Sequence, residues 1–150
     1  MIIEVKTENE MKAFGAQLGT LLKGGEVIEL VGDVGAGKTT LTKGIAVGLG
    51  VDEDVQSPSF TISRVYLARD NLVLAHYDFY RLQSAGIMAD ELNEAVSDAS
   101  TIIIIEWGGV VEGVLPSDRL TIQIDSPTES IRQLTVVSNG PISAAIEGEL

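Results

Sequence analysis

Residues 27–49 read VIELVGDVGAGKTTLTKGIAVGL, and this stretch decides the fold. A short apolar run comes directly after Glu26, and it predicts a buried strand over 26–31. The stretch closes with leucine and isoleucine at helical spacing, which predicts a helix over 38–49. Between them, residues 32–39 match the pattern G-x-x-x-x-G-K-[ST] in full. A strand, a glycine-rich turn and a helix in this order predict a loop that binds phosphate.

Each fixed residue type of this loop has a chemical role. The glycines allow backbone conformations closed to other residues, so main-chain amides can approach a phosphate. The ammonium of Lys38 can reach the β- and γ-phosphates, and the hydroxyl of Thr39 can ligate the Mg²⁺ that a nucleotide carries. An accidental match in a chain of this composition has odds below about 1 in 100, which disfavours a glycine-rich turn without a ligand.

The composition limits the partners of the chain. Its 150 residues fit one domain over 1–150, and 22 acidic against 10 basic side chains give a formal net charge of −12. Such a chain repels polyanions, so unaided binding to nucleic acid or to an anionic membrane is not expected. The absence of cysteine excludes disulfides, iron–sulfur clusters and a cysteine nucleophile. No apolar run approaches the length of a spanning helix, and we expect a cytoplasmic protein.

The rest of the chain alternates strand-like and helix-like segments. The further strands are predicted over 2–5, 60–67, 72–78, 101–106, 120–124 and 133–137. Thr7 and Glu10 form a capping-box pattern that opens a helix, another helix is expected within 85–96, and the last dozen residues have no clear pattern. The segments 60–67 and 72–78 are expected to pair antiparallel. The predicted fold class is α/β: a single P-loop NTPase domain in three layers, with a central mixed sheet that is mostly parallel and part antiparallel.

Two carboxylates end strand-like segments and are candidates for metal binding and hydrolysis. Asp78 closes the run VLAHYD, and Glu106 closes the run TIIIIE. Apolar residues before a terminal carboxylate are typical of a buried strand that reaches an active-site edge. Beside a phosphate-binding loop such a carboxylate holds or orients Mg²⁺, although by itself it is equally well a solvated strand end. The predicted catalytic residues are Lys38, Asp78 and Glu106, and the predicted metal ligands are Thr39, Asp78 and Glu106.

Several neighbouring residues have two interpretations each. His76, Asp78 and Tyr80 alternate and would share one face of a continuing strand, yet a lone histidine is more often a satisfied core residue than an acid–base group. Trp107, the only tryptophan, follows Glu106 and fits core packing as well as a place near the metal. Ordinary turn and strand chemistry and the sensing of a nucleotide are both compatible with Ser57, Ser59 and Thr61. Arg81 could contact a phosphate or cap a carboxylate.

Four blocks of the sequence resemble the TsaE (YjeE) family, the ATPase component of bacterial tRNA threonylcarbamoyladenosine synthesis. The blocks are GDVGAGKTT at 32–40, SPSFT at 57–61, HYDFYRL at 76–82, and IEWG at 105–108 followed by LPSDRL at 115–120. HYDFYRL is similar to the family's H-x-D-x-Y-R-L block, and this block and I-E-W are much more specific than the loop. Ser59 stands where the family often has threonine, and 83–98 is less patterned than the acidic helix of the family.

The resemblance implies a P-loop ATPase that uses ATP and Mg²⁺ and is stimulated by two partners, TsaB and TsaD. TsaD transfers the threonylcarbamoyl group to adenosine 37 of tRNA, and ATP hydrolysis by the TsaE-like subunit resets the complex between turnovers. Contact with tRNA would belong to the partners, in agreement with the net charge of −12. By similarity, Glu106 serves Mg²⁺ and Asp78 supports hydrolysis. The nucleotide-binding residues implied by the motif and the resemblance are Thr7, Val34, Gly35, Ala36, Gly37, Lys38, Thr39, Thr40 and Arg132.

Two other functions stay open on the residues alone. A small-molecule kinase would use the same loop, with Asp78 deprotonating a substrate hydroxyl, but the sequence has no evident arginine cluster to form a lid. A nucleotide-gated binding module with negligible hydrolysis would differ from the ATPase described above only in its turnover. A signalling GTPase is disfavoured because no Asn-Lys-x-Asp motif for guanine occurs in the sequence.

Overall fold

The order of strands and helices follows the sequence prediction. The structure is a computed structural model, and it describes residues 1–33, 35–56, 58, 62–80, 82 and 86–150. The strands are β1 (Ile2–Val5), β2 (Val27–Val31), β3 (Ser63–Leu67), β4 (Val73–Asp78), β5 (Thr101–Glu106), β6 (Leu120–Asp125) and β7 (Arg132–Ser138). The helices are α1 (Glu8–Leu21), α2 (Lys38–Gly48), α3 (Gly86–Val96) and α4 (Pro141–Glu149), with 3₁₀ turns η1 (Arg69–Asn71) and η2 (Gly108–Val111).

The described strands form one sheet in the order β1-β7-β6-β2-β5-β4-β3. The four inner strands β6, β2, β5 and β4 pair in parallel, whereas the pairs at both edges are antiparallel. Because β7 runs against both β6 and β1, all the described strands except β7 and β3 run in one direction. The predicted α/β class with a mixed, mostly parallel sheet is therefore confirmed. The carboxyl ends of β2, β4 and β5 meet at one end of the sheet, where ligands bind in folds of this kind.

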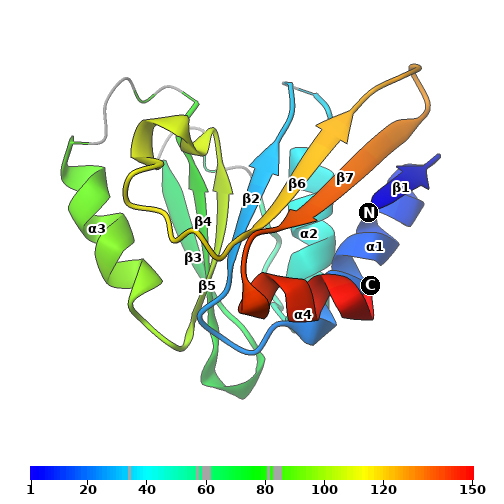
Figure 1. Cartoon of the computed structure of the whole chain (residues 1–150). Helices are drawn as coiled ribbons and strands as arrows, with labels where there is room; N and C mark the ends of the chain where they lie inside the picture. Colours follow the sequence, from blue (N-terminus) through cyan, green and yellow to red (C-terminus); the bar gives the residue numbers. More distant parts are fainter. Residues whose placement is uncertain (34, 57, 59–61, 81, 83–85) are drawn as a thin grey trace.

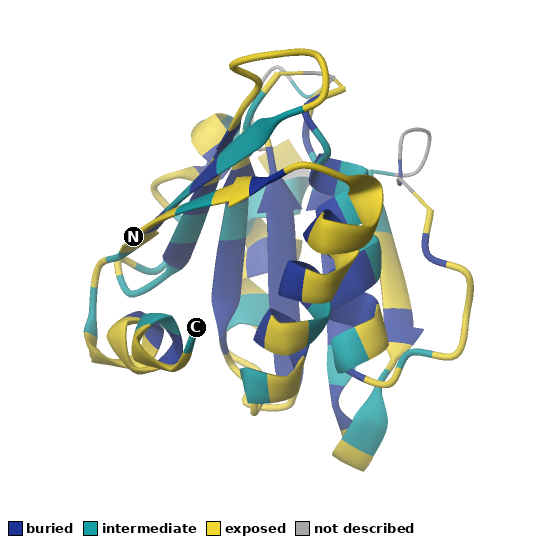
Figure 2. Cartoon of the chain, turned by 90° about the vertical axis from the view of Figure 1, so that its right-hand side faces the viewer, coloured by how far each residue is buried: buried dark blue, intermediate teal, exposed yellow. Residues whose placement is uncertain are grey.

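The sheet lies between two helical layers, as Figure 1 shows. Successive side chains of a strand point to opposite faces, so the four consecutive isoleucines of β5 serve both layers. Ile102 and Ile104 join the cluster formed with α1 and α2, and Ile103 and Ile105 join the cluster formed with α3. In Figure 2 the inner strands are dark blue along most of their length, and the helices are striped with buried and exposed positions. The predicted three layers are therefore present.

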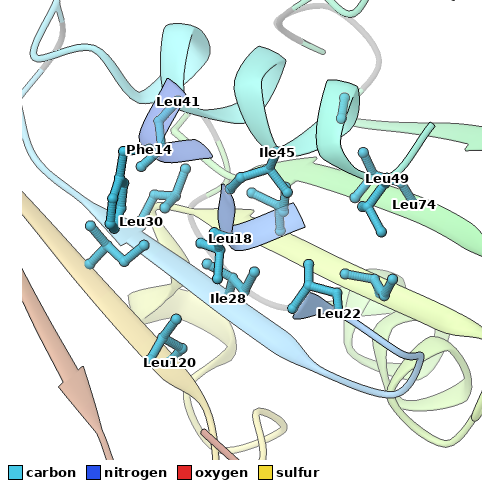
Figure 3. Packing of buried hydrophobic residues seen from close by; sticks show 14 of the residues in the cluster. Phe14, Leu18, Leu22, Ile28, Leu30, Leu41, Ile45, Leu49, Leu74 and Leu120 are labelled. Atoms are coloured by element: carbon cyan, nitrogen blue, oxygen red, sulfur yellow. The ribbon is translucent and has the colours of Figure 1, made fainter. Parts of the chain in front are cut away.

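The contact between α1 and α2 is the closest helix packing of the fold, and Figure 3 shows its apolar side chains. Leu18, Leu41 and Ile45 are fully buried there, each worth about 1.5–3 kcal/mol of hydrophobic stabilisation. Glycines let the two backbones touch: a Cβ on Gly15 would lie 2.7 Å from the carbonyl oxygen of Leu41, and one on Gly48 would collide with the backbone of Ala16. The helix that follows the glycine-rich loop is thus fixed against α1.

An arginine joins the carboxyl ends of the same two helices. The guanidinium of Arg69 donates to the carbonyl oxygens of Gly19 and Gly48 through Nη1, at 3.2 and 2.7 Å, and to those of Thr20 and Leu22 through Nη2, at 3.3 and 2.7 Å. A cation at helix carboxyl ends satisfies free carbonyl groups and is favoured by the helix dipoles. Arg69 therefore ties η1, between β3 and β4, to both helices.

Two local features differ from the sequence prediction or add to it. The strand expected from residue 60 begins only at Ser63, because Ile62 has a left-handed backbone (φ 67) that interrupts extended structure; residues 60 and 61 lie outside the described part. The unpatterned carboxyl terminus forms α4, whose first turn is capped from a distance by Asp118, 24 residues before Ile142. Within the described ranges, no helix is both long and apolar enough to cross a membrane.

Candidate functional site

The predicted glycine loop connects the end of β2 to the start of α2, as the light-blue trace in Figure 1 shows. Gly35 (φ 82) and Gly37 (φ 114) have left-handed backbones, which explains why these positions need glycine. Gly37 is the N-cap of α2 and offers no side chain to the free amides of the first turn. Those amides carry the positive end of the helix dipole, which favours an anion such as phosphate.

Lys38, the first residue of α2, turns back over this loop. Its Nζ donates to the carbonyl oxygen of Gly32 at 2.6 Å and lies 4.1 Å from the ring centroid of Trp107. Burial lowers the pKa of the ammonium, while the charges of Glu106, Asp78 and Asp33 act in the opposite direction. The cation is therefore held where loop and carboxylates meet.

The two predicted carboxylates are neighbours in the sheet. Asp78 ends β4 and is in register with Glu106, which ends β5. Glu106 is only 3% exposed, and Asp78 is half-buried with its Oδ1 accepting from the Tyr80 amide at 3.0 Å. These two carboxylates and the half-buried Thr39 hydroxyl in the first turn of α2 carry oxygen atoms, the donor type that Mg²⁺ prefers.

His76 is buried beside the carboxylates and contacts one of them. It is fully buried on β4, and its Nε2 lies 2.6 Å from Oε2 of Glu106. Strand β4 ends at Asp78, so Tyr80 does not continue the strand face that the alternation predicted. The structure therefore combines the two interpretations of His76. The ring is buried like a core histidine, and it is bonded to a residue of the predicted site.

A cleft of about 330 Å³ opens on the other side of the loop. Its wall brings together residues predicted from distant parts of the sequence, namely Thr7, Gly35, Ala36, Gly37, Thr40 and Arg132. Thr7 caps α1, accepting from the Glu10 amide at 3.0 Å, while the Glu10 carboxylate accepts from the Lys6 amide. The guanidinium of Arg132 donates through Nε to the Ala36 carbonyl oxygen at 3.1 Å, so β7 is tied directly to the loop.

An aromatic pair borders the loop on the carboxylate side. The rings of Tyr80 and Trp107 lie 5.0 Å apart, with 56% and 37% of the residues exposed. Trp107 therefore does not belong to the core, and its backbone is left-handed (φ 58), an uncommon state for a large side chain. It also lines a second cavity of about 540 Å³ with Gly32, Asp33 and Asp125.

The sequence reasoning missed a partly buried charge pair on the strand that leads into the loop. Arg119 donates through Nε to Oε1 of Glu29 at 3.1 Å and through Nη1 to the carbonyl oxygen of Pro116 at 3.0 Å. Glu29 is the one charged residue in the apolar strand VIELV, and a buried charge needs a partner. That signal predicts an ion pair, which holds the segment following η2 against β2.

Some predicted residues lie outside the described part of the chain. These are Val34, Ser57, Ser59, Thr61 and Arg81. The described site residues fall into two groups, with Asp78 and Glu106 at the strand ends facing the charge of Lys38, and Thr7, Thr40 and Arg132 at the cleft. The described residues contain no cluster of three or more His, Asp or Glu side chains placed to hold a metal ion by themselves.

Fold and site together define a three-layer α/β protein in which a G-x-x-x-x-G-K-T loop joins an inner strand to a covering helix. Residues 5–134 match the family model described as "Threonylcarbamoyl adenosine biosynthesis protein TsaE". The chain therefore belongs to the TsaE family.

Relatives and a solved structure agree with this assignment. The chain is 40% identical to the tRNA threonylcarbamoyladenosine biosynthesis protein TsaE of Streptomyces coelicolor, over 87% of this chain and 91% of that protein. The TsaE protein of Bacillus subtilis is 37% identical, over 87% of this chain and 81% of its own length. The crystal structure of Bacillus subtilis YdiB superposes with a TM-score of 0.81 at 33% identity, covering 99% of this chain and 92% of that one.

Proposed function

We propose that this protein is a Mg²⁺-dependent ATPase that acts in tRNA threonylcarbamoyladenosine biosynthesis. One observation carries the proposal: an uncapped helix amino terminus, a buried lysine and two carboxylates converge at the carboxyl ends of β2, β4 and β5. This combination can neutralise a polyphosphate and supply oxygen ligands to its metal. The proposed domain comprises residues 1–150, and the proposed location is the cytoplasm.

Each side chain has a distinct part in the proposed reaction. The loop amides and Lys38 bind the phosphates, for which Lys38 exchanges its bond to Gly32 for a phosphate oxygen. Thr39 and Glu106 would hold Mg²⁺, which would neutralise charge that develops on the phosphates. Asp78, less buried than Glu106, is free to orient and deprotonate the attacking water.

The cleft beside α1 is the proposed site of the nucleoside. Its volume of about 330 Å³ and its position against Gly35, Gly37 and Thr40 fit a group attached to phosphates in the loop. Thr7 and Arg132 also line this cleft, and Arg132 fixes the loop through Ala36. ATP is proposed as the nucleotide on the strength of family membership.

Proteins that resemble TsaB and TsaD are the proposed partners. The names of the relatives place them in the biosynthesis of a modified tRNA nucleoside. A surface with a net charge of −12 is poorly suited to bind tRNA directly, so tRNA contact is assigned to the partners. Hydrolysis would then reset the complex between rounds of transfer.

Phosphate release from Mg·ATP, measured for the chain alone and with TsaB, TsaD or both, tests this proposal. We expect slow release alone, stimulation by the partners, and none when a chelator removes Mg²⁺, because the partners order the site and the metal neutralises charge. Binding without hydrolysis in every combination would instead identify a nucleotide-gated module. Recovery of the γ-phosphate on a metabolite would identify a kinase.

A further inference from the structure

The hydrogen bond between His76 and Glu106 joins two buried side chains directly behind the loop. Nε2 of His76 lies 2.6 Å from Oε2 of Glu106, and the two residues are 0% and 3% exposed. Because an ionised carboxylate only accepts hydrogen bonds, a bond from the imidazole to such a carboxylate requires the tautomer with its proton on Nε2. No hydrogen bond to the other oxygen, Oε1, is found within the described residues.

Packing alone does not account for a histidine at this position. Its second nitrogen, Nδ1, is buried and has no hydrogen-bond partner in the described part of the chain. A buried polar atom without a partner destabilises the folded state, and an apolar side chain of similar size would avoid that cost. The imidazole is therefore best explained by what its other nitrogen does for Glu106.

Glu106 has a competing partner close by. Its charge is the largest of the three that raise the pKa of Lys38, which places the ammonium within its electrostatic reach. Within the described residues the two nevertheless form no ion pair, and Lys38 donates to Gly32 instead. A direct pair would occupy the phosphate-binding cation and the metal-binding carboxylate with each other.

We propose that His76 is a positioning residue, which anchors Oε2 of Glu106, keeps this carboxylate apart from Lys38, and leaves Oε1 directed to the metal of Mg·ATP. The proposal rests on the function proposed above. It gives His76 no contact with nucleotide, because the ring is fully buried and acts only through Glu106. Hydrogen bonds that orient a ligating carboxylate commonly change metal affinity by about 10- to 100-fold.

Three variants separate positioning from packing. His76→Gln retains an N–H donor close to the position of Nε2, and His76→Met removes the donor with little change in volume. Leu74→Met is the matched packing control, because Leu74 is equally buried on β4, two residues earlier and on the same face. Far-ultraviolet circular dichroism and urea unfolding establish that each variant is folded.

The readout is the ratio of ATP dissociation constants without and with Mg²⁺, measured by calorimetry. For His76→Met we expect this ratio to fall about 10- to 100-fold, whereas His76→Gln and Leu74→Met stay within about threefold of the wild type. In a Glu106→Gln background, His76→Met should have no further effect. An unchanged ratio in His76→Met, equal losses in the Gln and Met variants, or additive losses in the double variant would overturn the proposal.

The chain contains a single histidine, so its imidazole signals in nuclear magnetic resonance spectra need no assignment by mutation. The proposal predicts a slowly exchanging proton on Nε2 that shifts strongly in Glu106→Gln. A proton on Nδ1 alone would contradict it, whatever the nucleotide does. If the wild type binds no ATP, the proposed function fails, and these spectra still decide whether the two side chains are joined.

Discussion

The two sides of the glycine loop are built differently. On the side of β4 and β5, Glu106 and His76 are buried and bonded to each other, with Asp78 beside them. On the side of α1 and β7, the residues line an open cleft, and Arg132 is held by backbone carbonyl oxygens. Buried polar groups depend strongly on every neighbour, whereas groups at an open cleft tolerate change. Substitution of Asp78, the proposed base on the first side, should therefore alter turnover most, whereas substitutions at the cleft should alter affinity.

The largest effect is expected on the side of β4. Asp78→Asn should lower the rate of ATP hydrolysis by about 10²- to 10⁴-fold, because the amide cannot accept the proton of the attacking water. The affinity for Mg·ATP should change far less, as calorimetry on the same variant will show. Asp90→Asn, an exposed acid on α3, is the control and should hydrolyse ATP at the wild-type rate. Normal turnover in Asp78→Asn would remove this residue from the reaction.

A smaller effect tests how the two sides are held together. Gly48→Ala should reduce the free energy of unfolding by about 1–3 kcal/mol, because its Cβ would strike the backbone of Ala16 and separate α1 from α2. Gly148→Ala in α4 is the matched control, since a Cβ there meets nothing within 4 Å. It should leave stability unchanged or raise it by up to about 1 kcal/mol. Equal shifts in urea denaturation would show that the close helix contact is unimportant.

The face covered by α3 can be tested by pH. Burial, aided by the charge of Glu91, raises the pKa of Tyr77 to about 12 from a usual 10.0. The unfolded chain therefore loses this proton first, and the contribution of Tyr77 to stability is present below about pH 10 and is lost as the pH rises toward about 12. Between about pH 9 and about pH 11.5, the wild type should lose about 1–2 kcal/mol more unfolding free energy than Tyr77→Phe. If urea unfolding gives the same difference in stability between the wild type and Tyr77→Phe at both pH values, the expected burial of a neutral phenol is contradicted.

The smallest effect is expected at the cleft. Arg132→Met removes the hydrogen bond to the Ala36 carbonyl oxygen, and affinity for ATP should fall about 3- to 10-fold. The maximal rate of hydrolysis should stay the same, because no group at the strand ends is changed. Arg64→Met, on the exposed edge strand β3, is the control. A loss of maximal rate that exceeds the loss of affinity would erase the proposed division between the two sides.

The two sides also differ in how far the sequence predicts them. The strand ends are conspicuous, because a carboxylate after TIIIIE or VLAHYD interrupts an apolar run at the place where a parallel sheet exposes its ligand edge. The cleft residues are less conspicuous, because Thr7 and Arg132 come near the loop through contacts between distant segments, such as the pairing of β1 with β7 and the bond from Arg132 to Ala36. Resemblance to a family supplied those two residues, and local patterns did not.

Other features depend on partners that a local pattern does not contain. Asp118 caps α4 from 24 residues away, and Arg69 reaches carbonyl groups at the carboxyl end of α1 and its C-cap, 47 to 50 residues earlier. The buried bond between His76 and Glu106 likewise depends on the register of β4 with β5. Periodicity finds the elements, whereas such contacts become visible only when the sheet order is known.

Calorimetric titration of Mg·ATP into the folded chain tests the central claim most directly. The account predicts saturable binding at one site, weakened about 10- to 100-fold in Lys38→Ala, because that change removes a charge-assisted contact to phosphate. Lys43→Ala, five residues further along α2 and away from the loop, should bind as the wild type does. Absence of saturable heat with the wild type, or equal affinities for Lys38→Ala and the wild type, would contradict a phosphate-binding loop at residues 32–39.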